Sequence, residues 1–219
     1  MAHQPHHYLS YQDRVSEVAF AVLMVIIING YVALSNLNTG FWYIVGVNLG
    51  ACFGWGLIDG LVYAITSSLE RNSARRQLAA LQGIRDPTAL KAQARQAVSG
   101  SVFDSLSPEG KDAVADAFVA HMPTASAAGS VRLFTREDVT GWLSIISIYL
   151  IVGFVLALPF LVLPDKILAW VTSNVIGVIW LFWFGTQLGA CIGQHRLKLG
   201  AFMATIGLLF LAVSYYVWA

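Results

Sequence analysis

A single acid interrupts one of the most apolar stretches of the chain. Residues 54 to 64 read GWGLIDGLVYA, with Asp59 among glycine, aliphatic and aromatic residues. On a helix, which turns 100° per residue, three neighbours fall within about 60° of this acid: Asn48, Cys52 and Trp55. A face that carries a carboxylate, an amide, a thiol and an indole can line a path for a cation or a proton, and it can equally pack against another helix.

The composition places that face in a lipid bilayer. Of the 219 residues, 57% are hydrophobic and 11% are charged, whereas a soluble domain carries about 25% charged residues. Runs long enough to cross a hydrocarbon core of about 30 Å occur at 18–36, 41–67, 141–163, 167–193 and 199–218. The sequence therefore predicts an all-α, polytopic membrane protein with five transmembrane helices.

The cations indicate an orientation for these spans. If the chain crosses five times, Arg14, the Lys and Arg residues of 71–136 and the cations of 196–198 share one side, and Lys166 lies on the other. Membrane proteins keep Lys and Arg on the cytoplasmic side. We therefore expect the amino terminus inside and the carboxyl terminus outside.

The charge pattern also divides the chain into three parts. These are an N-terminal tail with a transmembrane hairpin (1–69), a cytosolic helical insert (70–138) and three further transmembrane helices (139–219). In the insert, Asp86 and Ser107 each place a capping oxygen before a proline suited to the first helical turn. The insert is predicted to hold helices at about 68–83, 87–104 and 108–121. Its predicted apolar core includes Leu81, Val98, Phe103, Leu106, Val114 and Phe118.

Other acids offer weaker candidates. Glu17 and Glu70 lie at the predicted cytosolic ends of the first two spans, where they could concentrate cations for Asp59. They could also form salt bridges with Arg14 and Arg71. In the insert, the carboxylates of Glu109, Asp112 and Asp116 could hold a hard cation or form an ordinary solvated face.

Small and uncharged polar residues inside the spans point to helix packing. Glycines recur every four residues in two spans, at Gly46, Gly50 and Gly54, at Gly56 and Gly60, and at Gly185, Gly189 and Gly193. Such spacing lets helix backbones approach closely in lipid. The amides of Asn29, Asn48 and Asn174 are expected to make hydrogen bonds between helices.

Signatures of enzymes do not occur in the sequence. It has no phosphate-binding glycine loop, no zinc-protease HExxH, no nucleophile elbow and no haem attachment motif. A formal charge of +1 gives no basis for binding nucleic acid. We therefore expect no enzymatic activity, no resident cofactor and no nucleic-acid partner.

Several phrases resemble small bacterial membrane proteins of the vacuolar iron transporter family. They are SEVAFAVLMVI, NLGACFGWGLIDGLVYAITSSLER, FTREDVTGW, LPFLVLPD and SNVIG, and the likeness extends over nearly the whole chain. The resemblance implies five membrane helices with a cytosolic insert, a homodimer, and movement of Fe²⁺ or Mn²⁺ in exchange for protons. In the family the Asp-Gly-Leu-Val phrase lies on the first membrane helix, whereas residues 59–62 lie on the second predicted span.

Residues and resemblance together predict a multi-pass transporter of Fe²⁺- or Mn²⁺-type divalent cations in the bacterial cytoplasmic membrane. Its hypothetical metal path comprises Asp59, Asn48, Glu17 and Glu70, lined by Cys52 and Trp55. A homodimer surrounded by membrane lipid is expected, because five helices alone rarely enclose a path. The alternative is a non-catalytic accessory or assembly subunit that docks on a larger membrane complex through its glycine-lined helices.

Overall fold

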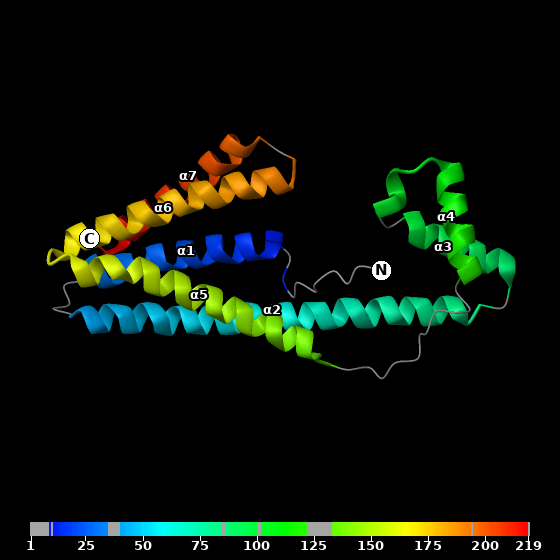
Figure 1. The fold of residues 1–219 in the computed structure, drawn as a ribbon, viewed down its shortest axis with the longest axis horizontal. Helices are drawn as coiled ribbons and strands as arrows, with labels where there is room; N and C mark the ends of the chain where they lie inside the picture. Colours follow the sequence, from blue (N-terminus) through cyan, green and yellow to red (C-terminus); the bar gives the residue numbers. More distant parts are fainter. Residues whose placement is uncertain are drawn as a thin grey trace, which may run out of the picture. The chain divides into compact units, whose positions relative to one another are not determined.

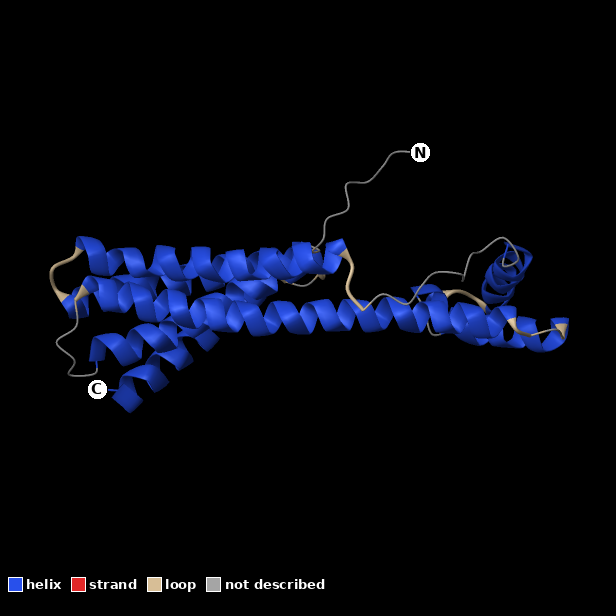
Figure 2. Ribbon diagram, turned by 90° about the horizontal axis from the view of Figure 1, so that it is seen from below, coloured by secondary structure: helices blue, strands red, loops and turns tan. Residues whose placement is uncertain are grey.

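The computed structural model describes residues 9, 11–34, 40–84, 86–99, 102–121, 133–193 and 195–218. Its helices, in chain order, are α1 (Tyr11–Leu34), α2 (Phe41–Gln82), α3 (Pro87–Ser99), the short 3₁₀ helix η1 (Val102–Ser105), α4 (Pro108–His121), α5 (Arg136–Val162), α6 (Lys166–Cys191) and α7 (Arg196–Trp218) (Figure 1). Helices and loops account for these ranges, and no strand occurs in them (Figure 2). The chain forms two compact units, residues 1–64 with 136–219, and residues 65–135.

The predicted all-α chain with five membrane-spanning helices is confirmed for the described residues. Helices α1, α2, α5, α6 and α7 are each long and apolar enough to cross a bilayer. The protein is therefore built as a multi-pass membrane protein. One boundary differs from the prediction, because the second span and the helix expected at 68–83 are one continuous helix, α2. Residues 61–82 contain neither glycine nor proline, so nothing breaks the helix there.

In the first unit, α1 is the central helix. It packs against α5, α6 and α7, and α6 and α7 form an antiparallel hairpin (Figure 1). The core contains aliphatic side chains of α1, α5 and α6 that are at most 1% exposed: Val22, Val25, Ile26, Ile145, Leu156 and Leu181. Because these residues come from three helices, the bundle is held together around α1.

Glycines set the closest helix contacts of this unit. A Cβ added at Gly185 would lie 2.8 Å from the Leu199 carbonyl oxygen, and one at Gly189 would lie 3.0 Å from the Arg196 Cα. These two glycines of the predicted stripe therefore let α7 pack on α6. Gly193 does not share that role, because it follows the end of α6 with a φ of +67° and meets nothing within 4 Å.

Of the two sets of glycines predicted to pack on α2, the first meets nothing in the described chain. A Cβ at Gly46, Gly50 or Gly54 would have no neighbour within 4 Å among the described residues. The second set, Gly56 and Gly60, lies further along the helix and makes close contacts with α5. Gly54 and Gly56, only two residues apart, thus differ completely in what they pack against, because they lie on different faces of the helix.

The second unit contains α3, η1 and α4. The Asp86 carboxylate accepts hydrogen bonds from the Thr88 and Ala89 backbone N–H groups at 3.1 and 3.2 Å, and the Ser107 hydroxyl accepts one from Gly110 at 3.2 Å. The predicted helix starts at 87 and 108 are confirmed. Of the helix expected over 87–104, the structure describes α3 to Ser99, and residues 102–105 form the 3₁₀ helix η1 in place of an α-helix.

The core of the second unit is smaller than predicted. Ala94, Val98 and Ala115 are buried, with Val114 and Val119 packed beside them. The prediction was wrong for three large side chains, because Phe103, Leu106 and Phe118 are 46%, 41% and 40% exposed. The two helices meet through alanine and valine, which leaves no room between them for aromatic rings.

Candidate functional site

Three helices of the first unit bring two acids to one phenol. The Tyr149 hydroxyl of α5 donates a hydrogen bond to Asp59 Oδ2 of α2. The Glu17 carboxylate of α1 lies beside the same hydroxyl and interacts electrostatically with Asp59. Tyr149 is fully buried, whereas Asp59 and Glu17 are only half-buried. We call Glu17, Asp59 and Tyr149 the carboxylate cluster.

A glycine contact holds the cluster's tyrosine against α2. A Cβ at Gly56 would lie 2.9 Å from the Ile146 Cα and 3.2 Å from the Tyr149 Cβ. At Gly60, a Cβ would lie 2.2 Å from the Trp142 ring, whose Nε1 donates to the Leu57 carbonyl at 3.0 Å. A side chain at either glycine would push α5 away, so these two positions fix where the phenol meets Asp59.

Another glycine contact between α5 and α2 explains the position of Cys52. A Cβ at Gly153 of α5 would lie 2.6 Å from the Cys52 Sγ. Cys52 is 0% exposed and forms no disulfide. Its thiol therefore fills the space that a glycine leaves in the neighbouring helix, as a small apolar side chain does.

The carboxylate cluster can hold a proton or a cation. Two carboxylates that interact across a membrane helix bundle repel one another, and either a shared proton or a bound cation removes the repulsion. The phenol adds a neutral oxygen, and hard cations prefer oxygen ligands. Within the described ranges, however, no group of three or more His, Cys, Asp or Glu side chains could hold a metal ion. One chain thus supplies two charged ligands at this place.

A second polar cluster lies further toward the start of α2. Asn48 Nδ2 donates to Asn29 Oδ1 at 2.8 Å, and Asn29 Nδ2 donates to the Ser173 hydroxyl at 2.8 Å. The Ser173 hydroxyl donates in turn to the Leu156 carbonyl at 2.6 Å. All three side chains are at most 1% exposed. We call Asn29, Asn48 and Ser173 the amide relay, and it joins α1, α2, α5 and α6.

The predicted stripe on α2 is therefore divided. Asp59 belongs to the carboxylate cluster, Asn48 belongs to the amide relay, and Cys52 packs on α5 between them. Trp55 is 39% exposed and lies edge-on to Phe20, with ring centroids 6.2 Å apart. Of the predicted path residues, only Glu17 joins Asp59.

Glu70 lies outside the carboxylate cluster. It is an exposed residue of α2, eleven positions beyond Asp59, and it belongs to the second compact unit. At 1.5 Å per residue this separation is about 16 Å along the helix. A role for Glu70 at the mouth of a path remains a prediction.

Tyr149 is the residue that the sequence reasoning missed. Tyrosines near the ends of spans serve as interfacial anchors, but Tyr149 lies thirteen residues after the first residue of α5. A phenol that deep in an apolar helix needs a hydrogen-bond partner. That depth is the signal that could have identified it as a partner for the intramembrane acid.

Aspartates of the second unit form ion pairs. Lys91 lies 2.7 Å from Asp116, and Arg95 lies 3.1 Å from Asp112. Its hydrogen bond with Asp116 raises the pKa of Lys91. Hydrogen bonds from its own backbone N–H and from Ser107 lower the pKa of Glu109. Asp112 and Asp116 therefore link α4 to α3, and Glu109 lies in the first turn of α4.

No family model matches the chain, and no curated protein matches it significantly. Because these comparisons give no match, the function is inferred from this geometry.

Proposed function

We propose that the protein is a membrane transporter that moves divalent cations of the Fe²⁺ or Mn²⁺ type in exchange for protons. The single observation that supports the exchange is the meeting of Glu17 and Asp59 at the Tyr149 hydroxyl, inside a bundle of membrane-spanning helices. An acid at the bilayer centre costs about 2.5 to 3.5 kcal/mol on insertion scales. Keeping two acids together inside a membrane bundle is explained if protonation and cation binding alternate there. The preference for iron or manganese rests on the family resemblance of the sequence.

The cluster is within reach of one membrane surface. Glu17 lies six residues after the first residue of α1, which is about 9 Å along the helix. The positive-inside rule puts that end of α1 in the cytoplasm, together with the second compact unit, and puts the carboxyl terminus outside. We propose the bacterial cytoplasmic membrane as the location. In this orientation cytosolic cations load at Glu17 and pass to Asp59.

A complete metal site calls for more ligands than one chain supplies. Two carboxylates and a phenol leave a six-coordinate cation with open positions. Water or a second copy of the chain would fill them, which is consistent with a homodimer. In the transport step, the cation replaces the protons on the two carboxylates on one side of the membrane. On the other side, protons replace the cation.

Flux measurements test the proposal. Purified protein in liposomes should move Fe²⁺ or Mn²⁺ inward or outward with an opposite movement of protons, which a pH-sensitive dye inside the vesicles reports. Asp59→Asn should reduce both movements to the level of protein-free liposomes. Absence of cation flux for the unaltered protein, with gradients of either sign, would overturn the proposed transport.

A matched variant controls for loss of charge. Asp165 is exposed, and its Oδ1 accepts a hydrogen bond from the Leu168 N–H at 2.8 Å as the N-cap of α6. Asparagine caps helices as well as aspartate does. Asp165→Asn should therefore keep full flux. Equal flux in Asp59→Asn and Asp165→Asn would remove Asp59 from the mechanism.

A specific observation favours the accessory-subunit alternative. Gly46, Gly50 and Gly54 leave a strip of α2 that no described residue covers, and large apolar side chains such as Phe53 and Leu57 flank it. A helix of another membrane protein could pack on such a strip. If this is the function, the native protein purifies with a larger complex, Gly50→Leu releases it, and no flux is measured.

A further inference from the structure

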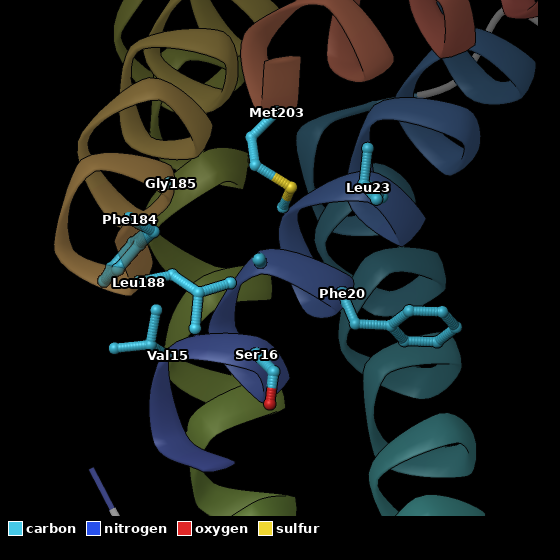
Figure 3. Close-up of a pocket in the computed structure, with 9 residues that line it drawn as sticks. Val15, Ser16, Phe20, Leu23, Phe184, Gly185, Leu188 and Met203 are labelled. Atoms are coloured by element: carbon cyan, nitrogen blue, oxygen red, sulfur yellow. The ribbon is translucent and has the colours of Figure 1, made fainter. Parts of the chain in front are cut away.

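An apolar hollow lies between α1, α6 and α7, and no member of either polar cluster lines it. Its volume is about 140 Å³, and its walls include Val15, Ala19, Leu23, Phe184, Leu188 and Met203 (Figure 3). The side chains of Leu23, Leu188 and Met203 extend into the space between the three helices (Figure 3). All three helices are long and apolar enough to span a membrane, so the hollow lies at bilayer depth.

Polar residues lie on the same three helices, within two helical turns of residues that line the hollow. Tyr11 lies one helical turn before Val15, and its hydroxyl is 3.5 Å from Gln187 Oε1. Gln187 directly precedes Leu188 on α6. Arg196 lies seven residues before Met203, which places the two within about 20° on one face of α7 and about 10 Å apart along it. Each of the three helices thus carries such a polar residue.

Arg196 is available to a ligand. It is exposed, and within the part of the chain that the structure describes it forms no ion pair. Arg14, a cation near the start of α1, is engaged differently, since its Nε and Nη2 donate to the Leu9 carbonyl at 3.3 and 3.2 Å. The Arg196 guanidinium, two helical turns before Met203 of the hollow, has the charge that a phosphate group complements.

We propose that this hollow binds an anionic phospholipid of the surrounding bilayer. One acyl segment fills the space among α1, α6 and α7, and the phosphate lies at Arg196 with the Gln187 amide and the Tyr11 hydroxyl beside it. Basic residues between transmembrane helices bind anionic head groups in this way. The inference goes beyond ion transport and does not depend on it.

The size of the hollow favours a lipid over a protein as its ligand. An apolar cavity of about 150 Å³ takes up a molecule the size of benzene, so this one accepts a segment of a flexible chain. A helix with its side chains is about 10 Å across and cannot enter it. Small wall residues, Ser16, Ala19 and Gly185, leave the depth that a narrow acyl chain needs.

Lipid retention in native mass spectrometry tests the proposal. The full-length protein in detergent is mixed with phosphatidylglycerol or with phosphatidylcholine, and bound lipid is counted at increasing concentration. We expect phosphatidylglycerol to bind more tightly, and Arg196→Gln to weaken it about fivefold, as expected for one cation at an anionic head group. Lys198→Gln is the matched control, because Lys198 is also exposed but points about 140° away from Met203. Equal weakening by both variants, or equal binding of both lipids, would overturn the site.

A second pair of variants tests the hollow itself. Leu23→Trp should fill the space and displace the lipid, whereas Leu208→Trp, at a site that is 53% exposed, should not. Thermal unfolding of each variant without added lipid shows whether it is folded. Lipid binding that survives in a folded Leu23→Trp protein contradicts the proposal. If Leu23→Trp instead converts a dimer to a monomer with lipid binding intact, the hollow is an interface between copies and the lipid site is wrong.

Discussion

The amide relay and the carboxylate cluster lie eleven residues apart along α2, but the chain treats them differently. In the relay, Asn48, Asn29 and Ser173 are at most 1% exposed, and the hydrogen bonds pass from one side chain to the next until they end on a backbone carbonyl. In the carboxylate cluster only the phenol is fully buried, and both acids remain half-buried.

The two clusters therefore differ in role: the amide relay holds helices together, and the carboxylate cluster can change its charge. Neutral amides and hydroxyls that bond one another bridge helices without a change of charge, each bond contributing about 1 kcal/mol or less in lipid. Carboxylates that repel one another and remain partly accessible can gain or lose protons. The relay therefore stabilises the bundle, and the carboxylate cluster is the part where an ion can act.

Placing a carboxylate in the amide relay has the largest expected effect on the free energy of unfolding. Asn48→Asp puts a carboxylate of nearly the same shape into the sealed relay, where it faces the Asn29 Oδ1 that Asn48 now donates to. We expect the free energy of unfolding to fall by about 2.5 to 3.5 kcal/mol, the cost of a buried charge on insertion scales. Unfolding in a denaturing detergent, followed by circular dichroism, measures it.

The pH dependence sharpens this test. When the acid introduced at position 48 is protonated, its O–H can donate to Asn29 Oδ1 and replace the lost bond. The destabilisation should therefore shrink as the pH falls and grow as it rises. Asp59→Asn serves as the reverse exchange and should change stability by less than about 1 kcal/mol. An Asn48→Asp protein as stable as the unaltered chain at high pH would contradict the view that the relay is sealed.

The sequence predicts the helices, but it does not predict which residues of different helices contact one another. Apolar length identifies five spans because the bilayer thickness fixes how long a helix must be, and capping oxygens before Pro87 and Pro108 identify two helix starts. Angular position alone placed Asn48 and Asp59 on one face. It could not show that about 16 Å of helix separates them, so that each meets different neighbours.

The contacts that build the carboxylate cluster depend on packing over long sequence distances. Tyr149 lies 90 residues beyond Asp59, and no spacing rule relates positions on different helices. The glycine pattern was equally ambiguous, because Gly50 and Gly56 look alike in the sequence. Only the second of them meets α5.

Substituting these two glycines gives the next largest effect. A Cβ at Gly56 would lie 2.9 Å from the Ile146 Cα, so Gly56→Ala should force α5 outward and destabilise the bundle by about 1 to 3 kcal/mol, the usual cost of overpacking. Gly50→Ala meets nothing within 4 Å and should be neutral, or stabilising by up to about 1 kcal/mol through helix propensity. Thermal unfolding of the two variants side by side measures the difference. Equal changes in both would show that the close contact between α2 and α5 does not exist in the membrane.

The smallest expected effect comes from removing one oxygen of the carboxylate cluster. Tyr149→Phe keeps the ring against Gly56 and removes the hydrogen bond to Asp59. One such bond contributes about 1 kcal/mol, so we expect cation flux in liposomes to fall about fivefold while the bundle stays folded. Tyr215→Phe is the control, because Tyr215 is 56% exposed on α7 and its ring contact with Trp170 does not need the hydroxyl. Flux that falls equally in both variants would mean that the phenol acts only through general stability, whereas a loss confined to Tyr149→Phe assigns the hydroxyl to the acid that carries the ion.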